Sequence, residues 1–145
     1  SAVRVSAGDF LRPASLRLEF GRTDPDVFYD EWLDLPALRR EVLERGDGKV
    51  LPRLWDAAAD RAYREPYVDL PPDGVVLVDG TLLLGRGLPF EVSVHLWLSA
   101  GALARRTPEG ERWRLPAYAR YERDGTRADV VVKADRAEHL AVIEP

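Results

Sequence analysis

The clearest hydrophobic pattern in the chain is an unbroken apolar run that starts at Val75 and ends at Asp79-Gly80. It follows the turn-forming residues 71–74, which are Pro-Pro-Asp-Gly. A continuous apolar run between turn signals is typical of a parallel strand that is buried on both faces. We therefore expect a central strand at residues 75–79.

Other segments show weaker versions of the same strand pattern, and helix signals lie between them. Strands are expected at residues 3–5, 92–98 and 128–132, with one more strand in the tail at 140–143 and an extended segment at 50–55. Asp24-Pro25 begins a helix, Asp34 and Pro36 restart it, and the glycines at 46 and 48 end it. Ser99 caps a further helix, and an arginine-rich helix is expected at about 111–123.

These elements alternate between strand and helix along the chain, without clear hairpin turns. Such an order indicates right-handed crossovers and an α/β fold with a mostly parallel sheet flanked by helices. We find no internal repeat and no linker, and 145 residues fit one domain. The sequence therefore predicts a single domain over residues 1–145.

Composition narrows the classes of protein. The chain is 46% hydrophobic and 32% charged, has a net charge of −4, and contains neither cysteine nor methionine. The absence of cysteine excludes disulfides and thiolate metal sites, and the negative charge argues against general nucleic-acid binding. No apolar run reaches the roughly 20 residues of a membrane span, so we expect a cytoplasmic protein that does not bind membranes. Because there is no methionine, we also expect residues to precede Ser1.

Polar residues follow three of the expected strands, at the edge where an open parallel sheet binds ligands. Asp9 follows the first strand, Asp79 ends the clearest one, and Arg105-Arg106 lie one helix beyond the third. Two carboxylates and an arginine pair are suited to phosphoryl transfer. One acid takes the proton of the attacking hydroxyl, the other helps to hold Mg²⁺, and the arginines neutralise the charge on the moving group.

Each of these residues also has a purely structural interpretation. Asp79-Gly80 is a common turn pair, and Asp9 can cap the turn that follows it. The arginines can form a solvated helix face, since 19 of the 21 basic residues are arginines. His95 and His139 lack the spacing of metal ligands. The prediction of a site rests on the three groups together, at one edge.

Several motifs occur in an order that resembles a known family. They are Val5-Ser6-Ala7-Gly8-Asp9-Phe10-Leu11-Arg12-Pro13, Thr23-Asp24-Pro25-Asp26-Val27-Phe28-Tyr29, Leu54-Trp55-Asp56, Val75-Val76-Leu77-Val78-Asp79-Gly80, Leu103-Ala104-Arg105-Arg106 and Ala128-Asp129-Val130-Val131. This ordered set resembles the bacterial uridine kinase-like proteins of the P-loop nucleoside kinase group. The motif sequences look most similar to those of actinobacterial members. The resemblance covers almost the whole chain.

The resemblance implies a P-loop NTPase-like three-layer sandwich that lacks its first strand and phosphate loop, which in the family come just before the first strand seen here. It implies ATP and Mg²⁺ as cofactors, a nucleoside-like (uridine-like) acceptor, and a short arginine-rich lid at about residues 100–127. Asp79 would be the metal-side acid, and Asp9, Arg105 and Arg106 would complete the catalytic set. The residues on the acceptor side would be Arg12, Asp24, Trp55, Asp56 and Arg61.

The chain also departs from the family pattern. Members commonly carry the catalytic aspartate one residue earlier than Asp9, where this chain has Gly8. Either Asp9 takes that role or the base is missing. Three functions therefore stay open. They are a phosphotransferase, a degenerate, non-catalytic domain that binds a nucleotide or another ligand, and a different nucleotide-dependent transferase on the same scaffold. A homo-oligomer is a further expectation.

Overall fold

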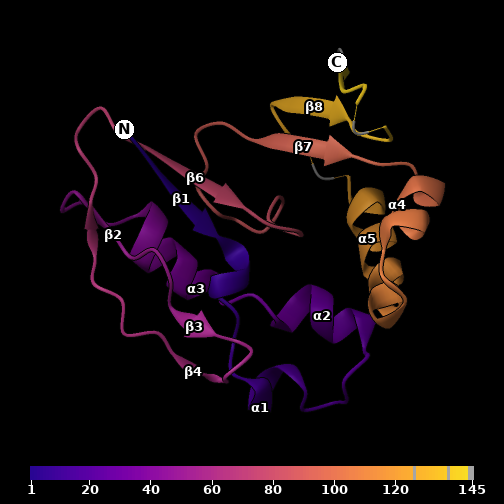
Figure 1. Cartoon of the computed structure of the whole chain (residues 1–145), viewed down its shortest axis with the longest axis horizontal. Coiled ribbons are helices and arrows are strands. Elements are labelled where there is room, and N and C mark those ends of the chain that lie inside the picture. Colours follow the sequence, from indigo (N-terminus) through magenta and orange to yellow (C-terminus); the bar gives the residue numbers. More distant parts are fainter. Residues whose placement is uncertain (126, 137, 144–145) are drawn as a thin grey trace.

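Two pairs of parallel strands organise the computed structural model, which describes residues 1–125, 127–136 and 138–143 (Figure 1). β1 (Ala2–Ser6) pairs with β6 (Val75–Asp79), and β7 (Val94–Trp97) pairs with β8 (Val130–Lys133). β9 (Ala141–Ile143) runs antiparallel to β8. The chain has an α/β fold, but its described strands form small sheets rather than the single extended parallel sheet expected from the sequence.

The strands follow the apolar runs closely. The run that predicted a central strand forms β6 at the expected residues, and the runs at 3–5, 92–98 and 128–132 overlap β1, β7 and β8. β6 is half-covered rather than buried on both faces, because Val75 and Leu77 are more than half exposed. The continuous apolar pattern was therefore a correct sign of a strand, although only one of its faces is packed.

The helices are short and begin at polar caps. α2 (Pro25–Glu31) starts at Asp24, α3 (Leu35–Leu38) at Asp34, and α4 (Ala100–Arg106) at Ser99. In each case the cap side chain accepts backbone N–H groups that the first helical turn leaves unpaired. The remaining helical elements are η1 (Ala7–Asp9), α1 (Ala14–Arg17), the π-helical turn η2 (Arg39–Leu43), the 3₁₀ segment η3 (Glu109–Arg114) and α5 (Leu115–Arg123).

Residues 49–69 contain two antiparallel ladders that the sequence analysis did not expect. β2 (Lys49–Val50) pairs with β5 (Val68–Asp69), and β3 (Trp55–Asp56) pairs with β4 (Arg61–Ala62). The turn between β3 and β4 ends at Asp60, whose φ of 51° lies in the left-handed region that aspartate tolerates better than most residues. The absence of hairpins was thus a wrong prediction for this segment.

Two apolar clusters hold the chain together. The first surrounds Phe10 and Leu38, both at 0% exposure, and receives Val76 and Val78 from β6. The second is aromatic, and packs α2 against α5 through residues Phe28, Tyr29, Trp32, Ala117 and Tyr121. Because α5 supplies two buried residues to this cluster, the C-terminal part of the expected lid at 100–127 is packed into the body of the domain. Within the described residues, no helix is long and apolar enough to cross a membrane.

Candidate functional site

The parallel pairing of β1 and β6 brings Asp9 and Asp79 to one edge. Ser6, the last residue of β1, lies opposite Asp79, and η1 then carries the chain to Asp9. The two acids are close enough for the Asp79 charge to contribute to raising the pKa of Asp9. The structure therefore places the two predicted acids at the same edge, where the carboxyl ends of the two parallel strands lie.

Asp9 is partly buried among charged neighbours. Burial is the main cause that raises its pKa, and Asp56, Asp79 and Glu65 raise it further, whereas Arg53 opposes them. The backbone oxygen of Asp9 accepts the Leu54 N–H at 3.0 Å, which ties the end of η1 to β3. A carboxylate that is partly removed from water binds a proton more readily, as a general base requires.

Asp79 is exposed and forms an ion pair with Arg4 that a ligand can replace. Arg4 Nε donates to Asp79 Oδ2 at 2.7 Å, with 78% of the Arg4 side chain and 48% of the Asp79 side chain exposed. Such an exposed pair contributes little to stability. A divalent cation can displace Arg4 at small cost. Asp79 can thus supply one oxygen ligand to a metal.

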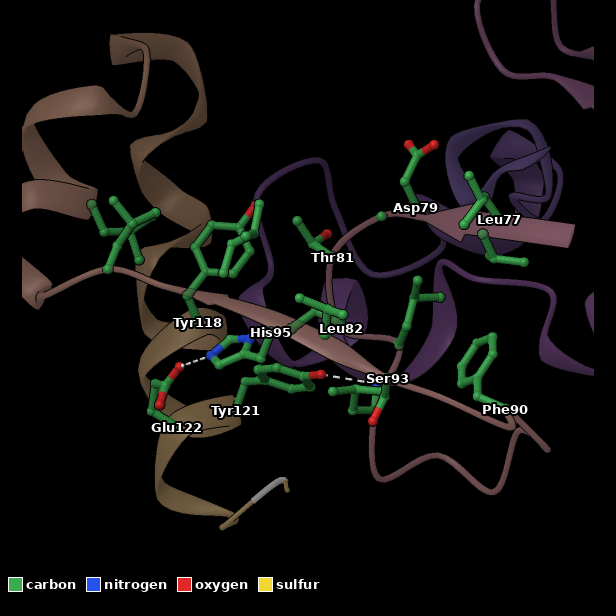
Figure 2. A pocket seen from close by; sticks show the side chains of 18 of the residues that line it. Leu77, Asp79, Thr81, Leu82, Phe90, Ser93, His95, Tyr118, Tyr121 and Glu122 are labelled. Atoms are coloured by element: carbon green, nitrogen blue, oxygen red, sulfur yellow. Dashed lines mark hydrogen bonds and ion pairs between the residues drawn. The ribbon is translucent and has the colours of Figure 1, made fainter. Parts of the chain in front are cut away.

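A cavity of about 640 Å³ begins beside Asp79 and runs between β6, β7, α4 and α5 (Figure 2). Thr81 and Arg106 also line it, so the predicted metal-side acid and one of the two predicted arginines share its wall. On β7, His95 Nε2 lies 2.8 Å from Glu122 Oε1, and the Tyr121 hydroxyl accepts the Leu84 N–H at 2.8 Å. The cavity wall is mainly apolar, with these polar groups set into it.

The two predicted arginines differ in their surroundings. Arg106 Nη1 donates to the Ala134 carbonyl oxygen at 2.7 Å, and Nη2 donates to the Asp135 carbonyl oxygen. Arg106 therefore ties the end of α4 to the residues after β8, while its side chain still lines the cavity. Arg105 is exposed on α4 and is not part of the cavity wall. Of the pair, Arg106 is the one placed to meet a ligand there.

Three of the five residues predicted on the acceptor side lie on the β3–β4 ladder, beside Asp9. Trp55 pairs with Ala62, and Asp56 pairs with Arg61. The Asp56 carboxylate accepts the Ala58 and Ala59 N–H groups at 3.1 and 3.2 Å, so it also shapes the turn. Trp55 Nε1 is buried and has no hydrogen-bond partner within the described part of the chain. A buried indole N–H without an acceptor is unusual in a native fold.

The other two acceptor-side residues are engaged by the scaffold. Arg12 forms an ion pair with Glu31 and donates to the Glu31 carbonyl oxygen at 3.2 Å. Asp24 Oδ1 accepts the N–H groups of Asp26 and Val27, which makes it the N-cap of α2. These contacts give both residues a structural role.

The sequence analysis did not identify Arg53, Glu65, Thr81 or the His95–Glu122 pair as parts of the site. Arg53 and Glu65 form an ion pair near Asp9, across 12 residues of sequence, and Glu122 reaches His95 from 27 residues away. No spacing rule connects such residues, because they meet only after β3, β4, β7 and α5 are placed. Comparison of the chain with protein families, with curated proteins and with solved structures finds no match.

Proposed function

We propose that this chain is the larger part of an ATP-dependent phosphotransferase that transfers a phosphoryl group to a hydroxyl of a nucleoside-like (uridine-like) small molecule. The observation that carries the proposal is the parallel pairing of β1 and β6, which sets Asp9 and Asp79 at one edge. Asp79 lines the cavity, whereas Asp9 lies outside its lining. The resemblance to uridine kinase-like proteins supports the same conclusion. A three-layer P-loop arrangement, with a phosphate loop outside these 145 residues, is part of this proposal.

Asp9 is the proposed base. The acceptor hydroxyl loses its proton to the Asp9 carboxylate as its oxygen attacks the γ-phosphorus of ATP, and the bond from that phosphorus to the bridging oxygen of ADP breaks. The partly buried position of Asp9, which raises its pKa, suits proton uptake at this point. Trp55, on β3 beside Asp9, offers its aromatic ring to the acceptor.

The residues at the edge fit one part of a Mg²⁺ site. Mg²⁺ in phosphoryl-transfer sites is usually held by one or two carboxylates, with phosphate oxygens and water completing the shell, and it neutralises charge on the phosphates. Asp79 supplies one such carboxylate. Within the described residues no group of three or more His, Cys, Asp or Glu side chains gathers as a metal site. The residues at this edge therefore fit a Mg²⁺ ion that Asp79 and the substrate phosphates would hold together.

The second candidate is a non-catalytic domain that binds a nucleotide or a related ligand. Two observations favour it. Gly8 stands where the resembling family commonly has an aspartate, and Arg106 is engaged with two carbonyl oxygens. A domain of this kind keeps the cavity for binding without transfer.

One assay distinguishes the phosphotransferase from the non-catalytic binding domain. The polypeptide made from its own start codon is incubated with ATP, Mg²⁺ and a panel of nucleosides, and phosphorylated products are measured. The first candidate predicts turnover that falls about 10²–10⁴-fold in Asp9→Asn and also falls in Asp79→Asn, with Asp73→Asn in an exposed turn as the matched control. Saturable nucleoside binding without turnover supports the second candidate. Turnover that Asp79→Asn leaves unchanged refutes the proposed site.

A further inference from the structure

The β3–β4 ladder is fastened at both of its ends to the segment that follows β1. At the open end, Leu54 donates its N–H to the Asp9 carbonyl oxygen at 3.0 Å, and the Leu54 carbonyl oxygen accepts the Tyr63 N–H at 2.9 Å. At the turn, Asp60 Oδ1 accepts the Ala14 N–H at 2.9 Å, which ties the ladder to the start of α1 (Figure 1). The charged side chains of this ladder therefore have a defined position relative to Asp9.

Three side chains at the open end of the ladder form a cluster that we call the clamp, namely Arg53, Tyr63 and Glu65. The Arg53 guanidinium forms an ion pair with Glu65, and its central carbon lies 4.4 Å from the centre of the Tyr63 ring. An ion pair and a cation–π contact thus hold the same guanidinium. The Arg53 side chain is 46% exposed, so these two contacts, rather than burial, keep it in place.

The charges around Asp9 act on it in opposite directions. Burial is the main cause that raises the pKa of Asp9, and Asp56 from β3, Asp79 from β6 and Glu65 raise it further. Arg53 is the cation that opposes them. The pKa of Arg53 is in turn raised, first by its hydrogen bond to Glu65, and the Asp9 charge contributes as well. Arg53 is therefore shared between two carboxylates, Glu65 in the clamp and Asp9 at the edge.

This sharing matters for a general base. A carboxylate that already holds a proton cannot accept one from an acceptor hydroxyl, and a carboxylate that binds protons too weakly is a poor base. Burial and three neighbouring acids favour the protonated form of Asp9, so a nearby cation is needed to keep it ionised. The clamp supplies this cation from the same ladder that carries the proposed acceptor-side residues.

We propose that Arg53 is a positioning residue for the Asp9 base, and that Glu65 controls how much of the Arg53 charge acts on Asp9. The inference rests on the proposed function for the role of Asp9 as a base. The effect of the two charges on Asp9 is a property of the chain itself and can be measured without catalysis.

The two partners of the ion pair have opposite expected effects. Loss of the Arg53 charge removes an attraction for the Asp9 carboxylate, so Asp9 should bind its proton more tightly. Loss of the Glu65 charge removes a repulsion and also releases Arg53, so Asp9 should bind its proton less tightly. A clamp with a purely structural role predicts the same result for both changes, because each of them breaks the same ion pair.

The test is an NMR titration of the Asp9 side-chain carboxyl carbon in the 145-residue chain, without ATP, Mg²⁺ or nucleoside. Arg53→Gln should tighten proton binding at Asp9 by about threefold or more, which moves the titration midpoint up by about half a pH unit. Glu65→Gln should move the midpoint down by a similar amount. Arg53→Lys keeps the charge and should titrate close to the unmodified chain. Lys49→Gln is the matched control, because it breaks the exposed Lys49–Asp69 pair on the β2–β5 ladder and should leave Asp9 unchanged.

Several results overturn the proposal. Midpoints that move in the same direction in Arg53→Gln and Glu65→Gln do so, because loss of a shared structural contact then explains both. An unchanged midpoint in Arg53→Gln has the same consequence. Where Arg53→Gln does not fold, Glu65→Gln decides, and a midpoint that stays or rises in that variant overturns the proposal.

The outcomes also separate this inference from the proposed function. Opposite midpoint shifts in a protein that transfers no phosphoryl group leave the effect of the clamp on Asp9 standing and refute only the kinase proposal. In a protein that does transfer it, the acid limb of kcat/KM should move up in pH in Arg53→Gln and down in Glu65→Gln. An acid limb that neither variant moves refutes only the role of the clamp.

Discussion

Substitutions at Asp24 test whether this residue has a structural role or a ligand-binding role. The resemblance to nucleoside kinases places it on the acceptor side, whereas its Oδ1 accepts the Asp26 and Val27 N–H groups at 2.9 and 3.1 Å at the start of α2. Replacing an aspartate N-cap by alanine costs about 0.5–2 kcal/mol, typically about 1. Asparagine keeps an acceptor oxygen at the same place and should cost only a few tenths of a kcal/mol.

The size of the effect on melting follows from the length of the chain. Unfolding entropies near 2.1 cal/mol/K per residue amount to about 0.3 kcal/mol/K for a chain of this length, so the loss of about 1 kcal/mol lowers Tm by about 3 °C. α2 contributes Phe28 and Tyr29 to the aromatic core cluster, so fraying of its first turn is transmitted to packed residues. We therefore expect Asp24→Ala to melt about 2–6 °C lower, and Asp24→Asn within about 1 °C of the unmodified chain.

The assay is thermal unfolding followed by far-UV circular dichroism, with Asp73→Ala in an exposed turn as the control. The reasoning fails if Asp24→Ala melts with the unmodified chain. It also fails if Asp24→Asn melts as low as Asp24→Ala, because the charge rather than the accepted hydrogen bonds would then matter. Loss of nucleoside binding in an Asp24→Ala protein of unchanged stability would instead support the acceptor-side role.

The remaining predictions concern the core and the response to pH. Leu38 is at 0% exposure, and Leu38→Ala should lower the free energy of unfolding by about 2–5 kcal/mol. Urea titration measures this loss, and the dependence of the free energy on urea concentration (the m-value) should stay unchanged. Because the folded-state pKa of Asp9 is raised, chiefly by burial, the folded state holds its proton more tightly. The free energy of unfolding should fall as pH rises from the unfolded pKa of Asp9 through the folded one, and Asp9→Asn should remove that fall. The pKa of Glu41 is lowered, first by the hydrogen bond from the Tyr67 hydroxyl, so its stabilisation is present above its unfolded pKa and is lost as pH falls through the folded one. Tyr67→Phe should lower stability at pH 7 and weaken this loss in acid, and identical acid titrations of the two proteins would contradict that account.

Local structure was largely predictable from the sequence, because its signals lie within a few residues of each other. The apolar run at 75–79 and the caps at Asp24 and Ser99 needed only neighbouring residues, and the structure confirms all three. The expected helix at 111–123 was predicted as one element, whereas the structure divides it into η3 and α5. The division falls at the Leu115-Pro116 start of α5, where proline lacks the N–H that would continue the preceding turn.

The pairing of strands could not be predicted in the same way. The ladders of residues 49–69 have only two residue pairs each, so no strand pattern long enough to recognise precedes them. The four main strands were expected in one sheet, and they form two parallel pairs instead. Which edges pair depends on atoms contributed by distant segments, and a strand's own residues do not specify that partner.

The sequence by itself determined the α/β class, the main strands, the helix starts and the placement of Asp9 and Asp79 after strands that could share an edge. Tertiary structure decided that these two acids do share that edge and that Asp24 and Arg12 are engaged by the scaffold. It also buries the Trp55 indole N–H near Asp9, with no hydrogen-bond partner among the residues that the structure describes. The physical reason is the range of the interactions. Hydrogen bonds of caps and turns span a few residues, whereas burial, ion pairs and sheet edges depend on groups that only the folded chain brings together.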